Sequence, residues 1–287
     1  MKRNLLREIE EKMPTFSKGQ KFIAKYVLEN YDKAAYMTAS KLGSEVNVSE
    51  STVVRFANEL GFAGYPEFQH ALREIVRTKL TSFQRMEVTN NLIGDGDILT
   101  KVLISDSDKI RRTLEEIDRQ AFSDAVDSIV RARKIYILGA RASAFPAGFL
   151  AHSLRMIFDD VIHVQTSSGS EMFEQLMGLG EEDTVIAVSF PRYSKKIINA
   201  VDFSKRTGAN VISVTDSAMS PIAPQADQLL LAKSDMASFV DSLAAPLSII
   251  NAIIVAVSKK KQDELGVRLH QLESIWDEYD VYDKNQG

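Results

Sequence analysis

Cysteine is absent from this sequence of 287 residues, and histidine occurs only four times. The absence of cysteine excludes disulfide bonds, thiolate zinc sites and cysteine nucleophiles. His70, His152, His163 and His270 show no metal-ligand spacing, so we expect neither a metal ion nor a cofactor. No apolar run approaches the ~20 residues that span a bilayer. The first residues carry charges where a signal peptide is apolar, and we therefore expect a cytoplasmic protein without a membrane partner.

Charge is distributed unevenly along the chain, whose formal net charge is -4. The first 80 residues hold 13 of the 35 Lys and Arg residues but only 10 of the 39 Asp and Glu residues. The remaining residues carry an acidic excess. A mildly basic amino-terminal part permits a polyanionic partner there, although an excess this small is weak evidence without a motif.

The amino-terminal third shows helical periodicity only. In the segment SKGQKFIAKYVLENY, apolar residues recur every three or four positions and form one face. Ser17 and Thr38 are suited to the N-cap position. We expect helices over residues 4–12, 17–30, 38–46, 49–60 and 66–82. The following segment, 81–98, contains NN and GDGD and breaks the period, so we expect it to be turn-rich and place the domain boundary at about 84–97.

The segment LGSEVNVSESTVVRF, Leu42 to Phe56, has the spacing of a helix-turn-helix. Gly43 permits two short helices to approach closely. Asn47 tolerates the left-handed turn between them. Ser49 is expected to cap the second helix, and Gly61 to end it.

The second helix of this motif carries the candidate contacts to DNA. Its amino-terminal half enters a major groove in helix-turn-helix proteins, where Arg forks onto guanine and hydroxyl side chains contact bases or phosphates. The candidates for base and phosphate contacts are Ser51, Thr52, Arg55, Asn58, Lys21, Lys25 and Lys41. The alternative is a helical interaction module whose polar face is simply solvated.

From Lys134 onward, strand-like and helix-like segments alternate. After two expected helices at 98–116 and 120–132, this alternation predicts βαβ units and a parallel sheet. We expect strands at 134–139, 161–165, 184–190, 210–216 and 228–232, and helices at 143–158, 169–179 and 194–207. The apolar tract 242–258 is too uniformly apolar for a surface helix, so it packs on the sheet or at a subunit interface.

Three of the expected strands end in residues suited to an anion. Ligands of open parallel sheets bind beyond the carboxyl ends of the strands, and here those ends read GARAS, SFPRYSKK and TDSAMSP. Hydroxyls, cations and the N–H groups that open a helix together form an anion site. The candidate effector-binding residues are Gly139, Arg141, Ser143, Ser189, Arg192, Tyr193, Ser194, Lys195 and Glu171. The alternative is that the serines only cap helices and the cations are solvated.

The chain resembles the RpiR/MurR family of bacterial transcription regulators. The segment VSESTVVRFANELGFAGYPEF (48–68) is similar to that family's recognition helix, and GARAS, SFPRYSKK, TDSAMSPIA and SFVDSLAAPLSIINAI are similar to its SIS, or sugar isomerase, domain. The resemblance implies an all-α helix-turn-helix domain (1–82), a linker (83–97) and a SIS domain (98–287) with a parallel five-stranded α/β sandwich.

The resemblance also implies partners and roles. They are double-stranded operator DNA, a sugar phosphate effector held by Ser143, Ser189 and Ser194, and a homodimer or homotetramer formed through the SIS domain. The implied function is regulation of carbohydrate metabolism. The family's hydroxyl-rich loop after the third strand is interrupted here by Phe190, Pro191 and Arg192.

An isomerase with a fused helical domain is the alternative function. Such an enzyme needs a base near the substrate carbon, usually Glu or His. The four histidines are better interpreted as structural, which leaves Glu171 and Glu174 as candidate bases or as acceptors for sugar hydroxyls. Because an isomerase has no need of a helix-turn-helix, we favour a sensor without catalytic residues.

Overall fold

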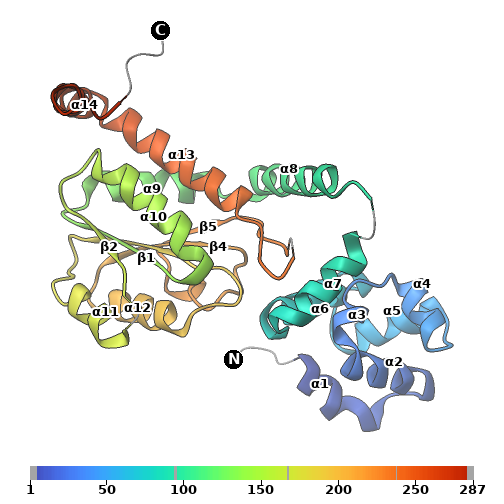
Figure 1. Cartoon of the computed structure of the whole chain (residues 1–287). Coiled ribbons are helices and arrows are strands. Elements are labelled where there is room, and N and C mark those ends of the chain that lie inside the picture. The colour runs from blue at the N-terminus through green and yellow to red at the C-terminus, as the bar shows by residue number, and fades with distance from the viewer. Residues whose placement is uncertain (1–4, 94–95, 167, 237, 283–287) are drawn as a thin grey trace. The chain divides into compact units, whose positions relative to one another are not determined.

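The computed structural model describes residues 5–93, 96–166, 168–236 and 238–282. The chain divides into two compact units, Met1–Gly94 and Asp95–Gly287 (Figure 1). No helix in the described ranges has both the length and the apolar character needed to cross a membrane.

The described part of the first unit is helical. Its elements are α1 (Leu5–Lys12), a short 3-10 helix (Met13–Thr15), α2 (Lys18–Glu29), α3 (Tyr31–Ala34), α4 (Ala39–Glu45), α5 (Glu50–Glu59), α6 (Tyr65–Lys79) and α7 (Ser82–Ile93). The five expected helices are confirmed, with ends that differ by at most three residues. The hydroxyls of Ser17 and Thr38 accept hydrogen bonds from backbone N–H groups and so act as N-caps.

The expectation of a turn-rich segment over 81–98 is wrong for most of its length, because α7 occupies Ser82–Ile93. A reciprocal cap explains its start. The Gln84 N–H donates to the Thr81 hydroxyl at 3.3 Å, and the Thr81 N–H donates to the Gln84 side chain at 3.0 Å. This T-x-x-Q pattern is a capping box. The short helix α3 was also not expected.

The turn between α4 and α5 has the expected geometry. A Cβ atom on Gly43 would lie 2.7 Å from the carbonyl oxygen of Val48, so only glycine fits there. Asn47 adopts φ 54°, the left-handed conformation. Gly61, with φ 80°, ends the second helix. Ser49 occupies the N-cap position of α5 but makes no capping hydrogen bond through its side chain.

The second unit contains a parallel sheet with strand order β2-β1-β3-β4-β5. The strands are β1 (Ile135–Gly139), β2 (Val161–Val164), β3 (Thr184–Val188), β4 (Asn210–Thr215) and β5 (Gln228–Leu231). The helices are α8 (Ile98–Glu116), α9 (Arg119–Arg131), α10 (Ala144–Arg155), α11 (Gly169–Leu176), α12 (Lys195–Arg206), α13 (Ala244–Lys260) and α14 (Gln262–Glu278). This confirms the expected α/β sandwich.

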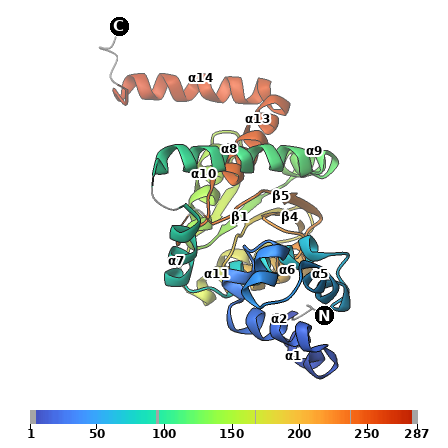
Figure 2. The same cartoon turned by 90° about the vertical axis from the view of Figure 1, so that its right-hand side faces the viewer.

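Helices cover both faces of the sheet. Helices α9, α10 and α13 lie on one face, and α11 and α12 on the other (Figures 1 and 2). Alternate residues of β1 point to opposite faces, so Ile137 packs in the first layer and Leu138 in the second. Because both faces are buried, the strands are continuous apolar runs, the pattern from which they were predicted.

The apolar tract 242–258 forms most of α13 and packs on the sheet. Its buried side chains include Ala245, Ile249, Ile250 and Ile253, which belong to the same core as α10. The first of the two expected alternatives is therefore confirmed for this side of the helix. Val255 points outward and is 67% exposed.

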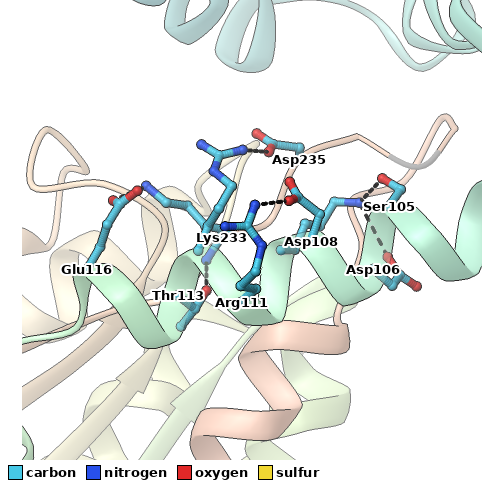
Figure 3. Close-up of polar contacts among 10 residues, drawn as sticks. Ser105, Asp106, Asp108, Arg111, Thr113, Glu116, Lys233 and Asp235 are labelled. Carbon is cyan, nitrogen blue, oxygen red and sulfur yellow. Dashed lines mark hydrogen bonds and ion pairs between the residues drawn. The ribbon is translucent and has the colours of Figure 1, made fainter.

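Polar contacts attach α8 to the segment that follows β5 (Figure 3). The backbone N–H of Lys233 donates to the Thr113 hydroxyl at 2.9 Å, and the Ser242 hydroxyl donates to the Asp106 carboxylate at 2.6 Å. Lys109 is only 4% exposed, and its ammonium group lies 3.3 Å from the same carboxylate. These contacts, together with apolar packing against α13, hold α8 on the second unit.

Candidate functional site

A cavity of about 710 Å³ lies at the carboxyl ends of β1, β2 and β3, the edge at which the sequence predicts a ligand. Strand order reverses between β1 and β3, so the loops that follow them diverge and leave room for a ligand. The residues that line the cavity are Gly139, Ala140, Arg141, Ala144, Val164, Gln165, Thr166, Met172, Arg192, Tyr193, Ser194, Lys195 and Lys196.

Most of the effector-binding candidates line this cavity. The structure brings together Gly139, Arg141, Arg192, Tyr193, Ser194 and Lys195. Ser143, Ser189 and Glu171 are not among the lining residues. The loop after β4, TDSAMSP, does not contribute a described lining residue either, although the sequence predicted that it would converge there.

Two of the predicted serines lie beneath the cavity. Ser143 is 6% exposed, and its hydroxyl accepts a hydrogen bond from the backbone N–H of Phe190 at 3.3 Å. Ser189 is 2% exposed, and its backbone N–H donates to the Val214 carbonyl at 3.1 Å. The Ser143 contact ties the loop after β1 to the loop after β3, and the Ser189 contact extends the pairing of β3 with β4.

Four cationic side chains line the cavity. Arg141, Arg192, Lys195 and Lys196 are all exposed, and none of the described lining residues is acidic. Arg141 has φ 58°, a conformation that turns the chain sharply after β1. Like charges gathered in this way repel one another unless an anion lies among them. The cavity is therefore electrostatically suited to an anion.

The amino terminus of α12 adds backbone donors to this arrangement. Ser194 occupies the N-cap position, and its hydroxyl makes no capping hydrogen bond to the helix. The first N–H groups of a helix lack intrahelical partners, and the helix dipole is positive at this end. Ser194 and these groups form a site of the kind that binds phosphate.

Tyr193 links the cavity to the buried end of β4. Its hydroxyl donates to the Asp216 carboxylate at 2.8 Å, and the Thr215 hydroxyl donates to the same oxygen at 3.1 Å. Asp216 is only 5% exposed. The loop after β4 therefore contacts a residue that lines the cavity, although it does not line the cavity itself.

Sequence reasoning missed the contribution of β2. Val164, Gln165 and Thr166, at the end of this strand, line the cavity together with Met172 from α11. Glu171 is exposed and accepts a hydrogen bond from the Thr166 hydroxyl. The signal that could have found these residues is the strand order, which places β2 next to β1.

Neither His152 nor His163 lines the cavity. His163 lies on β2, where burial lowers its pKa and the neighbouring Arg155 guanidinium lowers it further. In the described part of the chain, no group of three or more His, Asp or Glu side chains is arranged to hold a metal ion.

The candidate DNA-contacting face lies on α5 in the first unit. Ser51, Arg55 and Asn58 are exposed, whereas Thr52 is half-buried. The Arg55 guanidinium donates to the Ser51 carbonyl at 3.3 Å and to the Thr52 hydroxyl at 3.4 Å. The side chain therefore lies along the amino-terminal half of the helix. Val53, on the opposite face, is fully buried.

The lysine candidates lie on helices that contact α5. Lys21 and Lys25 are exposed on α2, and Lys41 is exposed on α4. A Cβ atom on Gly19 would lie 3.3 Å from a methyl group of Thr52, so α2 lies close to the first turn of α5. Exposed cations beside a recognition helix are suited to phosphate contacts.

The two units define a class of protein: a helix-turn-helix joined to an α/β domain with a cavity lined by cationic side chains. Two models of known protein families match this chain. The helix-turn-helix domain of the rpiR family matches residues 3–79, and the SIS domain matches residues 128–256. Together they cover more than half of the chain, which belongs to the RpiR family of helix-turn-helix transcriptional regulators.

Bacterial relatives are named as transcriptional regulators. An HTH-type transcriptional regulator of Caldanaerobacter subterraneus is 25% identical over 272 residues, covering 91% of this chain and 93% of its own. The regulator HexR of Escherichia coli is 26% identical over 230 residues, covering 78% of this chain and 75% of its own.

Solved structures have the same fold. The sugar isomerase domain of an RpiR transcription factor from Sphaerobacter thermophilus is 26% identical, with a TM-score of 0.58, and covers 61% of this chain and 97% of its own. The Vibrio vulnificus NanR protein complexed with ManNAc-6P is 22% identical, with a TM-score of 0.60, and covers 96% of this chain and 99% of its own.

Proposed function

We propose that this RpiR-family regulator binds operator DNA through α5 and senses a phosphorylated sugar in the cavity at the carboxyl ends of β1, β2 and β3. On this proposal it regulates genes of carbohydrate metabolism and acts in the cytoplasm. Residues 1–82 are the DNA-binding domain and residues 98–287 the SIS domain. The observation that carries the proposal is a cavity lined by four cations, with no acidic residue among its described lining.

The cavity suits each part of a sugar phosphate. Arg192, Lys195, Ser194 and the first N–H groups of α12 are placed to bind the dianionic phosphate. Gln165 and Thr166 provide neutral polar groups for sugar hydroxyls. The volume lies within the range of small-molecule sites, roughly 300–1,000 Å³. The NanR structure, a relative in fold, carries the phosphorylated sugar ManNAc-6P.

The lining supports binding rather than isomerisation. Proton transfer between sugar carbons requires a base within hydrogen-bond reach, and Glu and His are the usual groups. The described lining contains neither. The relatives from Caldanaerobacter subterraneus and Escherichia coli are also regulators. We therefore assign no catalytic residue, and the isomerase alternative is not favoured.

A titration with matched ligands tests the effector site. Calorimetry compares ManNAc-6P and glucose 6-phosphate with the same sugars lacking phosphate. We expect at least one phosphorylated sugar to bind and its free sugar to bind far more weakly. Because a hydrogen bond to a charged group contributes roughly 1.5–3 kcal/mol, Ser194→Ala is expected to weaken binding about ten- to a hundredfold.

Two further variants sharpen this test. Arg192→Ala is expected to weaken binding of the sugar phosphate, whereas Arg206→Ala removes a cation from the last turn of the same helix, outside the lining, and should leave binding unchanged. Ser194→Ala should keep its melting temperature, since the hydroxyl does not cap α12. Equal affinity of the parent, Ser194→Ala and Arg192→Ala would place the effector elsewhere.

A further inference from the structure

We propose that Asp216 is a positioning residue for effector binding: it holds Tyr193, and through Tyr193 it sets the direction of the cationic loop before α12. This inference rests on the proposed function of the cavity. Asp216 itself is outside the cavity lining. Its hydrogen bond with the Tyr193 hydroxyl, at 2.8 Å, crosses from the end of β4 to the loop after β3.

The chemistry of Asp216 argues against direct contact with the effector. A carboxylate repels a phosphate, so its presence beside an anion site weakens binding unless it has another role. Burial of a carboxylate is also costly without donors to it. The hydroxyls of Tyr193 and Thr215 supply such donors, and both reach the same carboxylate oxygen. These two contacts offset part of the cost of burying Asp216, and the one with Tyr193 joins it to the loop after β3.

The Tyr193 hydroxyl has one proton, and this proton is donated to Asp216. It cannot be donated to an effector at the same time. Tyr193 is half-buried and lines the cavity. Besides any hydrogen bond that its oxygen accepts, its contribution to binding is the placement of its ring and of its neighbours in the chain, Arg192 and Ser194, both of which line the cavity.

The loop before α12 is fixed near both of its ends. Residues 189–194 lie between β3 and α12 without helix or strand structure. Arg192 lies in this loop, and Lys195 and Lys196 follow it directly in the first turn of α12. The start of the loop is fixed by the Ser143 contact to Phe190. The Tyr193 contact to Asp216 fixes the far end, just before the first turn of α12. A loop ordered in advance loses less conformational entropy when the effector binds.

The test is a double-mutant cycle on the full chain, with ManNAc-6P, glucose 6-phosphate and inorganic phosphate as probes. Tyr193→Phe and Asp216→Ala are each expected to raise the Kd of the bound probe about tenfold, because the loop then has to be ordered when the probe binds. Because both remove the same contact, the double variant should also be about tenfold weaker, not a hundredfold. Asp216→Asn retains an acceptor oxygen for Tyr193, so its Kd should remain within about threefold of the parent's.

Two controls separate a positioning role for Asp216 from a general loss of stability. Asp227→Asn changes a carboxylate that lies near the start of β4, at the opposite edge of the sheet, and should leave the Kd unchanged. Tyr193→Phe keeps the ring, so it provides the test if the buried Asp216→Ala does not fold. Melting temperatures recorded for each variant show whether stability changes, and coupling between Tyr193 and Asp216 in the Kd is a readout that reduced stability does not produce.

The outcomes distinguish the inference from the function on which it rests. If Arg192→Ala weakens binding but Tyr193→Phe does not, the cavity binds the probe and the positioning role of Asp216 is overturned. Additive losses in the double variant would also overturn it, since Tyr193 and Asp216 would then act separately. If no probe binds the parent protein, the proposed effector site fails and this inference fails with it.

Discussion

Arg55 is the side chain on which sequence-specific DNA binding is expected to depend most. Its guanidinium lies along the exposed amino-terminal half of α5 and is held by the Ser51 carbonyl and the Thr52 hydroxyl. A guanidinium presented in this way can fork onto guanine. We expect Arg55→Ala to weaken operator binding by ~1–3 kcal/mol and to relax specificity at one base pair. Footprints and binding isotherms on operator and unrelated DNA measure both effects, and unchanged footprints would contradict this placement of the recognition helix.

Lys25 is expected to behave differently, since it is exposed on α2 and not on α5. A phosphate contact releases counterions and carries no sequence information. Lys25→Ala, or Lys21→Ala, should therefore weaken binding to operator and unrelated DNA alike and reduce the slope of log K against log salt by about one. Isotherms at several salt concentrations measure this slope. A loss confined to the operator would indicate that the lysine reads a base.

Single residues also show where sequence reasoning about the cavity succeeds and where it stops. Arg141, Arg192 and Lys195 were predicted from their place after strands, and the structure brings them together. Ser143 and Ser189 occupy equivalent positions, yet both are buried beneath the lining. The two sets differ in side-chain direction at a loop, which depends on packing between β1, β3 and β4. Neighbours in sequence do not determine that direction.

Elements were predicted more reliably than their side chains. The strands are apolar runs covered on both faces, a pattern visible in the sequence, and the connections between them predict a parallel sheet. The sequence does not predict helix α7, because Asn90 and Asn91 are typical of a turn, whereas the signal for the helix is the Thr81–Gln84 capping box at its start. The contribution of β2 to the cavity was missed because it requires the strand order and not the local motif.

The polar contacts that attach α8 to the rest of the second unit lead to a prediction about stability. The ammonium group of Lys109 is almost fully buried beside the Asp106 carboxylate (Figure 3). The same carboxylate accepts a hydrogen bond from the Ser242 hydroxyl. Asp106→Ala leaves a buried charge without this partner, and we expect a loss of about 2–3 kcal/mol in the free energy of unfolding. Lys109→Met removes the buried ammonium group itself and leaves a carboxylate that is partly exposed and still accepts from Ser242, so it should cost less than Asp106→Ala.

Urea unfolding of the full chain, followed by the fluorescence of Trp276, measures this difference, because the single tryptophan lies on α14 in the second unit. The order of the two variants is the informative result. If Lys109→Met is the more destabilising, the ion pair itself stabilises the attachment of α8, and the argument from an uncompensated buried charge is wrong.

For the whole molecule, the exposed apolar surface of α8 indicates assembly. Leu99, Leu103, Ile110 and Leu114 recur at helical spacing, and each is between 40% and 70% exposed. Ile110 and Leu114 also line an apolar groove of about 300 Å³ between α8, α9 and α13. Contiguous exposed apolar surface of this kind usually marks an interaction site. We propose that it pairs with a second copy of the chain, since a helix-turn-helix obtains its affinity from two half-sites.

A charge placed on this surface tests the assembly. The double variant Leu103→Glu, Leu114→Glu forces two carboxylates into any apolar interface formed by α8, at a desolvation cost far above the ~1.5–3 kcal/mol gained by burying each leucine. Light scattering at micromolar concentration is expected to show at least a dimer for the parent and a monomer for the variant. Operator affinity should fall steeply, because one half-site no longer assists the other.

Met177→Glu, at the end of α11 on the other face of the sheet, changes a residue that is 82% exposed and should leave both the mass and the affinity unchanged. A parent that is monomeric, or a variant that keeps the parent's mass, would show that the apolar surface of α8 does not form the subunit interface.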